Sequence, residues 1–243
     1  MGDSMLKKND PFLKYIWEKY NLDNEVNVNE DNDILLFCKV FDTDFYNLLN
    51  QPKNICRKLL RNLKVAKYSN IPKDHSKHCS NILYWLYYEI KEHKISKESI
   101  KGIFDALDNI INDGNIATLN CSGLITIEDL LQPEELVMLY IFMHNIDVIQ
   151  EILNKDNDII KCSCKKFIKQ CVDSYKSKYE DYPTNCNDMK TNKFTCLAVN
   201  EFKTRYEGNL SDEKIKYSLP QLSSETPTDI IDCNPSEKID LLP

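Results

Sequence analysis

Glycine is scarce in this 243-residue chain, which contains only five. Folds built from β-strands and loops that cradle phosphates both need glycine at backbone positions with positive φ. The shortage therefore favours helices. It also leaves the sequence without the G-x-G-x-x-G and G-x-x-x-x-G-K-[ST] patterns that bind nucleotides.

Histidine and the short motifs of hydrolases are equally sparse. The four histidines are His75, His78, His93 and His144, and none lies in a recognised catalytic signature. Nucleophilic catalysis by cysteine needs a thiolate beside an imidazole. The sequence also contains neither a G-x-S-x-G elbow nor an H-E-x-x-H helix. We therefore expect no enzymatic activity and no cofactor.

Long apolar runs are missing as well. Spanning a bilayer takes about 20 consecutive apolar residues, and the richest stretch, Leu136 to Met143, is short. Met1 to Pro11 is polar and lacks the apolar centre of a signal peptide. These residues predict a soluble chain.

A concentration of positive charge, which nucleic-acid binders use to displace counterions, is not evident either. The net charge is −7, and no block of Lys or Arg stands apart from acidic neighbours. We expect no nucleic-acid partner. Apolar residues make up 42% of the chain and charged residues 28%, which is ordinary for a folded protein.

Cysteine, by contrast, is abundant. The ten cysteines are even in number, lie throughout the chain and form no C-x2-C pairs of the kind zinc sites use. Scattered cysteines are typical of disulfides between distant elements, and the spacing leaves the pairing open. The alternative is a set of buried thiols in a reducing compartment. The disulfide candidates are Cys38, Cys56, Cys79, Cys121, Cys162, Cys164, Cys171, Cys186, Cys196 and Cys233.

Apolar residues recur at helical spacing through most of the chain. The pattern predicts an all-α body over residues 1–206 with about seven to nine helices. Ile34 to Val40 is compatible with either helix or strand. The expected helices are Pro11 to Tyr20, Pro52 to Lys67, Asp74 to Glu92, a helix capped by Ser96 and ending near Gly114, a brief turn capped by Thr126, Pro133 to Asn154, Asn157 to Tyr182 with a lysine-rich outer face, and Asp188 to Tyr206 with Phe194, Leu197, Phe202 and Tyr206 as its apolar residues.

The composition changes at Glu207. Ser, Thr, Pro and acidic residues dominate from there to the end, with prolines at positions 220, 227, 235 and 243. Such a composition is typical of an extended linker. We expect residues 207–243 to form a poorly ordered polar tail or stalk.

Two short clusters can be interpreted as metal sites. In a helix Cys162 and Cys164 point about 200° apart, whereas Cys164 and Cys171 share a face. This favours disulfides to different neighbouring elements over a metal. His75 and His78 share a helical face next to Cys79, but no third and fourth ligand is evident. We therefore predict no metal site.

An aromatic run at Tyr84 to Tyr88 is the remaining candidate for a binding site. Tyr and Trp anchor many protein interfaces, but consecutive positions cover more than one face of a helix. We expect Trp85 to lie in the core, with one or two of the tyrosines at the surface.

The same run carries a resemblance to a known family. Cys79-Ser-Asn-Ile-Leu-Tyr-Trp-Leu-Tyr-Tyr88 resembles the C-x-x-L-x-Y-W-L-Y block of the Plasmodium interspersed repeat (PIR) proteins, especially their vivax (VIR) branch. The order of the other features also fits: Cys38 near the start, Cys-x-x-Leu from Cys56, and a cysteine-rich segment from Cys162 to Cys196 that Phe202 and Tyr206 close. The likeness covers residues 10 to 206.

The resemblance implies a variant surface antigen of malaria parasites. It implies a helical, disulfide-stapled ectodomain on a stalk, exported to the infected red-cell membrane or surface. Its variable surface would bind a host receptor or adhesion protein, meet host antibodies, and serve cytoadherence and immune evasion. Family members commonly lack an ordinary signal peptide, which Met1 to Pro11 matches. We expect a monomer that would attach to the membrane only through a C-terminal transmembrane helix absent from this chain. The chain is either truncated just before the membrane, which the Pro-rich tail ending at Pro243 favours, or a soluble variant.

Two other functions stay open at the level of the sequence. The protein could be a structural or trafficking component of the infected cell, acting through a membrane or cytoplasmic part. It could also be a cytosolic helical adaptor with reduced cysteines.

Overall fold

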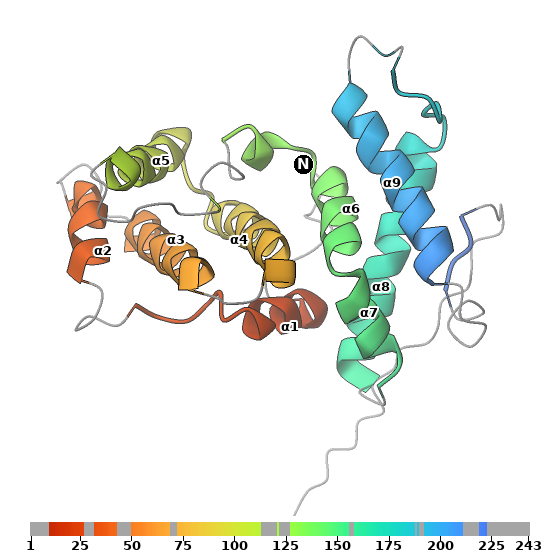
Figure 1. Ribbon diagram of the computed structural model, residues 1–243, viewed down its shortest axis with the longest axis horizontal. Helices are drawn as coiled ribbons and strands as arrows, with labels where there is room; N and C mark the ends of the chain where they lie inside the picture. The colour runs from red at the N-terminus through yellow and green to blue at the C-terminus, as the bar shows by residue number, and fades with distance from the viewer. Residues whose placement is uncertain are drawn as a thin grey trace, which may run out of the picture. The chain divides into compact units, whose positions relative to one another are not determined.

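The computed structural model describes residues 10–26, 32–42, 50–68, 72–112, 121, 127–155, 158–187, 189, 192–210 and 219–222. Every regular element in these ranges is a helix, which confirms the predicted all-α class (Figure 1). The chain divides into two compact units. The N-terminal unit contains Leu13–Pro133, and the C-terminal unit contains the chain from Glu134 onward together with Asp10–Phe12. The pattern of the sequence does not predict this division.

The N-terminal unit is built around two long helices that lie side by side in Figure 1, α3 (Asn50–Tyr68) and α4 (Pro72–Glu92). The chain enters it through α1 (Pro11–Lys19), whose first two residues belong to the other unit. The segment whose helical or extended form the sequence left open is helical, as α2 (Asn32–Phe37) and the 3₁₀ helix η1 (Cys38–Asp42). The remaining elements are α5 (Lys97–Asn112) and the 3₁₀ helix η3 (Asp129–Leu131).

Helix α4 is a core helix, and this corrects the prediction for its aromatic run. Trp85 is fully buried as expected, but Tyr84, Tyr87 and Tyr88 are also at most 4% exposed, so none lies at the surface. The reason is that α4 has neighbours on more than one side. Helix α3 and η3 both pack against it, the Tyr87 hydroxyl donates to the Gln132 carbonyl at 3.3 Å, and the ring of Tyr88 lies 6.5 Å from that of Trp17.

The turn after α1 is held by side chains of α3 and α4. Asn62 donates from its amide to the Leu22 carbonyl at 2.9 Å, and the Trp85 indole donates to the Asp23 carboxylate at 2.9 Å. These bonds satisfy polar groups that would be costly to bury alone. Ser96 caps α5 as predicted, because its hydroxyl accepts from the Ser99 amide at 3.2 Å.

The C-terminal unit contains α6 (Glu134–His144), α7 (Ile146–Leu153), α8 (Asp158–Ser174), the π-helix η4 (Tyr175–Tyr179) and α9 (Lys193–Asn209). Helix α6 packs against both α8 and α9 (Figure 1). Its core is aromatic: the ring centroid of Phe142 lies 5.0 Å from that of Phe202 and 5.6 Å from that of Tyr206. Phe12 joins the core at a centroid distance of 4.6 Å from Phe167.

The single long helix predicted from Pro133 to Asn154 is wrong, because it is broken at Asn145. Helices α6 and α7 meet there at 73°. Asn145 is fully buried, and its side-chain amide and its main-chain N–H both donate to the Ile141 carbonyl, at 3.0 and 3.1 Å. The main-chain bond is the regular helical one, and the side-chain amide competes with it for the same carbonyl. Among the described residues no single helix is long and apolar enough to cross a membrane, and only this bent pair, taken together, reaches that composition.

The end of the C-terminal unit also differs from the prediction. Helix α9 continues past Tyr206 to Asn209, and part of the expected stalk packs back on it. Leu219 and Leu222 are buried, and the Tyr206 hydroxyl donates to the Pro220 carbonyl at 2.5 Å. The rest of residues 211–243 lies outside the described residues.

Candidate interaction surface of the C-terminal unit

The cysteines that the sequence analysis named as disulfide candidates are of two kinds in the described part of the chain, disulfide-bonded and free. Three disulfides are formed, Cys38–Cys56, Cys79–Cys121 and Cys186–Cys196, with Cα–Cα distances of 6.0, 5.3 and 5.8 Å. These distances lie within the usual range for disulfides. Cys162 is also disulfide-bonded. Cys233 lies outside the described residues.

Cys164 and Cys171 are free thiols, which corrects the expectation that they would bond to neighbouring elements. They do share one face of α8, as predicted, but that face is the buried one. A separation of seven residues places them about 10 Å apart along the helix, too far to bond to each other. The Cys171 thiol instead donates to the Met138 carbonyl at 3.7 Å.

Both thiols are poor nucleophiles. Burial raises the pKa of Cys164 well above its usual range, and the charge of Asp10 acts in the same direction. Burial likewise raises the pKa of Cys171. Since the thiolate is the reactive form, these side chains act as small apolar residues of the core.

The histidines are scattered over both units. His78 contacts the ring of Tyr20 edge-on at 5.4 Å, His93 lies 3.4 Å from the Glu89 carboxylate, and His144 stacks on Tyr140 at 6.5 Å. The side chain of His75 lies outside the described residues. In the described parts of the chain, His, Cys, Asp and Glu nowhere gather in groups of three that could hold a metal ion.

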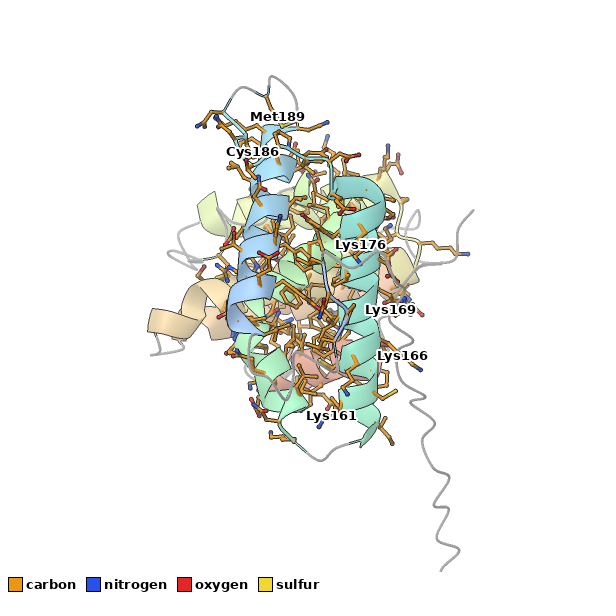
Figure 2. The ribbon with its side chains drawn as sticks, turned by 90° about the vertical axis from the view of Figure 1, so that its right-hand side faces the viewer. Lys161, Lys166, Lys169, Lys176, Cys186 and Met189 are labelled. Atoms are coloured by element: carbon orange, nitrogen blue, oxygen red, sulfur yellow. A yellow bond between two sulfur atoms is a disulfide. The ribbon has the colours of Figure 1, made fainter. Side chains whose placement is uncertain are left out.

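The loop that joins η4 to α9 contains several exposed residues. We call residues 183–197, which comprise this loop and the start of α9, the tip. Figure 2 shows Cys186 and Met189 of this loop beyond the ends of α8 and α9. The disulfide Cys186–Cys196 ties the loop to the first turn of α9. The base of the tip is thus covalently fixed.

Polar contacts reinforce this attachment. The Asn200 amide donates to the Pro183 carbonyl at 2.9 Å and lies 3.2 Å from the sulfur of Cys186. The Met189 N–H donates to the Cys186 carbonyl at 3.3 Å. Asn192, just before α9, has a φ of 61°, a left-handed conformation that asparagine tolerates better than most residues. Local sequence therefore favours a sharp entry into the helix.

Two apolar side chains project from the tip. Phe194 is 83% exposed and Leu197 is 48% exposed, whereas Phe202 and Tyr206, further along the same helix, are buried. The four residues were predicted together as the apolar residues of α9, but Phe194 and Leu197 lie on the outer face. Their spacing of three puts them side by side on the helix. The other exposed large apolar residues in the described chain lie singly on separate elements: Leu36, Leu131 and Ile159.

A second surface feature runs along α8 and η4. Lysines line the outer side of these elements, and we call the partly exposed Lys161, Lys165, Lys169 and Lys176 the lysine stripe, with the exposed Lys166 beside it. Figure 2 shows Lys166, Lys169 and Lys176 following one another along the outside of this helix. The sequence predicted this lysine-rich outer face.

A comparison with family models gives one match. The model described as Plasmodium vivax Vir protein matches residues 13–226, which include parts of both units, the tip and the lysine stripe. No curated protein and no solved structure matches the chain.

Proposed function

The chain belongs to the Plasmodium vivax Vir protein family, as its sequence resemblance predicted, and from this premise we propose that it recognises a host protein through its tip. Membership suggests a protein of the variant surface antigen type. Specifically, we propose a non-enzymatic ectodomain that is exposed at the infected red-cell surface, binds a host receptor and is recognised by host antibodies.

The exposed pair Phe194 and Leu197 carries this proposal. An 83% exposed phenylalanine beside a half-exposed leucine leaves apolar surface in water, at a cost of about 25 cal/mol for each Å² of it. Aromatic side chains of this kind anchor interfaces when they enter an apolar pocket of the partner. We infer that the partner offers such a pocket.

The attachment of the tip supports the same role. The disulfide Cys186–Cys196 and the Asn200 contacts hold the base of the loop against α9. A pre-formed loop loses less conformational entropy when it binds, which favours affinity. A partner would then meet Phe194 and Leu197 on a rigid helix.

Polar groups flank the apolar pair. Glu201, one turn further along the outer face, pairs with Arg205 at 2.7 Å, and Arg205 also donates to the Met143 carbonyl at 2.7 Å. An apolar centre with a polar rim is the usual composition of a protein interface. Because the outer residues of the tip make few core contacts, they can vary between family members without loss of the fold, which suits escape from antibodies.

The direct test is a panel of host surface proteins, probed with the folded, oxidised chain. For any partner found, we expect Phe194→Ser combined with Leu197→Ser to weaken binding by at least about ten-fold, as loss of an anchor residue does. The matched control is Leu36→Ser combined with Leu131→Ser, which removes two exposed apolar residues of the N-terminal unit. Equal binding by both double variants would contradict a role for the tip.

The cellular part of the proposal needs a separate experiment. Labelling of intact infected cells with a reagent that does not cross membranes should modify this protein. Protection from the label would instead favour a structural or trafficking role inside the infected cell. If the protein is labelled but binds no host protein, a decoy role for antibodies would replace recognition.

A further inference from the structure

The charge of this chain is distributed very unevenly. Residues 159–178 contain six lysines and one aspartate, a net charge of +5. The whole chain carries −7, so the remainder carries −12, the difference between −7 and +5. This segment and α3, whose 19 residues contain six Lys and Arg and no acidic residue, therefore both carry local positive charge on a chain of negative net charge, which corrects the expectation that no basic block stands apart.

Helical geometry spaces part of this charge along the outer side of α8. Lys161, Lys165 and Lys169 are each four residues apart, so they lie on successive turns about 6 Å apart along the axis. Lys176 continues the same face into η4. Phe167, Cys171 and Tyr175, on the inner side of the same elements, are buried in the core. The core thus fixes the orientation of the lysine stripe, which extends over about 20 Å.

Three lysines of residues 159–178 have polar partners that the structure shows. Asp173 pairs with Lys169 at 2.8 Å, and Glu135 pairs with Lys178, which lies outside the stripe. The Lys161 ammonium donates to a neutral group, the Lys155 carbonyl, at 3.2 Å. Partial burial lowers the pKa of Lys165, and the charge of Lys161 acts in the same direction. A ligand that brings negative charge would relieve this repulsion between neighbouring lysines.

We propose that the lysine stripe binds a linear sulfated polysaccharide. Basic stretches of this length form heparin-type sites by displacing counterions along an extended polyanion. A chain of sulfated sugars presents negative groups in a row, which matches charges spaced by one helical turn. This surface is distinct from the tip, and the choice of an extracellular polyanion rests on the surface exposure in the proposed function.

Two other polyanions fit the stripe less well. A helix that lies in a membrane surface needs an apolar face beside its basic face, but the apolar face of α8 is buried in the core. Single-stranded nucleic acids are held by exposed aromatic rings as well as charge. Tyr175 and Tyr179, the aromatic residues of η4, are both buried.

The test uses the full, oxidised chain and heparin as the probe. In the stripe variant, glutamine replaces the four lysines of the stripe: Lys161→Gln, Lys165→Gln, Lys169→Gln and Lys176→Gln. The control variant removes the same charge from exposed positions of the N-terminal unit: Lys14→Gln, Lys39→Gln, Lys97→Gln and Lys101→Gln. Circular dichroism spectra and melting curves of both variants establish that they are folded.

We expect the unaltered chain to bind immobilised heparin with an affinity that falls as salt rises. The stripe variant should lose at least about ten-fold in affinity and show a weaker salt dependence, since it makes fewer ionic contacts. The control variant should bind as the unaltered chain does. Equal losses in the two variants, or no heparin binding at low salt, would overturn the proposal.

Further binding experiments distinguish heparin binding by the stripe from membrane binding and from binding through the tip. Binding to vesicles that contain an anionic phospholipid, without binding to heparin, would replace the polysaccharide with a membrane. The variant with Phe194→Ser and Leu197→Ser should keep its heparin affinity. If heparin binding fails while a host protein is still bound through the tip, only the inference about the stripe is wrong. If heparin is bound but no host protein is, the proposed function of the tip fails instead.

Discussion

The two units of this molecule differ in their cysteines, since free buried thiols occur among the described residues only in the C-terminal unit. In the N-terminal unit, Cys38–Cys56 joins η1 to α3, and Cys79–Cys121 ties α4 to a point 42 residues away. All four of these cysteines are buried. In the C-terminal unit, Cys186–Cys196 closes a loop of only 10 residues at the tip, while the core contains the free thiols Cys164 and Cys171.

This difference in the cysteines indicates which interactions stabilise each unit. The N-terminal unit has short helices such as α2 and η1, which a covalent link to α3 holds in place. The C-terminal unit closes its core with the rings of Phe142, Phe202 and Tyr206. Its pair Cys186–Cys196 can therefore fix the shape of an exposed loop. The two disulfides of the N-terminal unit thus stabilise its fold, whereas Cys186–Cys196 fixes an exposed loop; Cys162 of the C-terminal unit is disulfide-bonded as well.

The largest expected effect is the loss of the aromatic core. Phe202→Ala removes a fully buried ring that contacts Phe142, Tyr175 and Tyr206. It should destabilise the C-terminal unit by about 3–5 kcal/mol. Hydrogen exchange in α6 and α9 measures this directly. The only two tryptophans, Trp17 and Trp85, lie in the N-terminal unit, so its unfolding is followed separately by fluorescence. An equal shift in the fluorescence transition would show that the units unfold together.

Removal of the Cys79–Cys121 cross-link comes next. Cys79→Ala combined with Cys121→Ala frees a loop of 42 residues and should destabilise the N-terminal unit by about 4 kcal/mol. The fluorescence transition in urea measures the loss. The control is Cys186→Ala combined with Cys196→Ala, which should leave that transition in place and increase hydrogen exchange only around the tip. A fluorescence shift of similar size in the control would contradict the different roles of the disulfides in the two units.

A smaller effect distinguishes a core thiol from a functional one. Cys171→Ser places a hydroxyl in an apolar site and should cost about 1–3 kcal/mol, whereas Cys171→Ala should cost less. Both are measured by hydrogen exchange in α8. A serine variant as stable as the unaltered chain would indicate that the site is more polar than the structure shows.

The smallest expected effect is a loss of stability at alkaline pH. Burial raises the pKa of Tyr179 to about 12, and it also raises the pKa values of Tyr175 and Tyr206. A phenol whose folded pKa exceeds its unfolded value of about 10 contributes stability below pH 10, which is lost as the pH rises toward 12. The C-terminal unit should therefore be less stable at pH 11 than at pH 8. Tyr179→Phe should reduce this loss, and an unchanged pH profile would contradict the burial of the phenol.

Much of the fold follows from the sequence because helix periodicity and caps are local. The apolar spacing placed α1, α3, α4 and α5 within a few residues, and Ser96 marks the start of α5. The break at Asn145 was missed. Its cause is a buried amide that bonds the Ile141 carbonyl, and an apolar pattern that continues on both sides conceals it.

The features of the candidate surface depend on tertiary packing. Periodicity cannot distinguish Phe194 and Leu197, which face outward, from Phe202, which faces α6 and η4. The unpaired state of Cys164 and Cys171 likewise depends on the face of α8 that is buried, although the shared face itself was predicted from their spacing. The packing of Leu219 and Leu222 was concealed by the polar composition around them.

Mapping of thiols by mass spectrometry tests the central claim most directly. The unreduced protein is unfolded, alkylated and digested, and the labelled and cross-linked peptides are identified. We predict alkylation of Cys164 and Cys171, and peptides linked as Cys38–Cys56, Cys79–Cys121 and Cys186–Cys196. Alkylation of these six cysteines, or a disulfide at Cys164 or Cys171, would contradict the account.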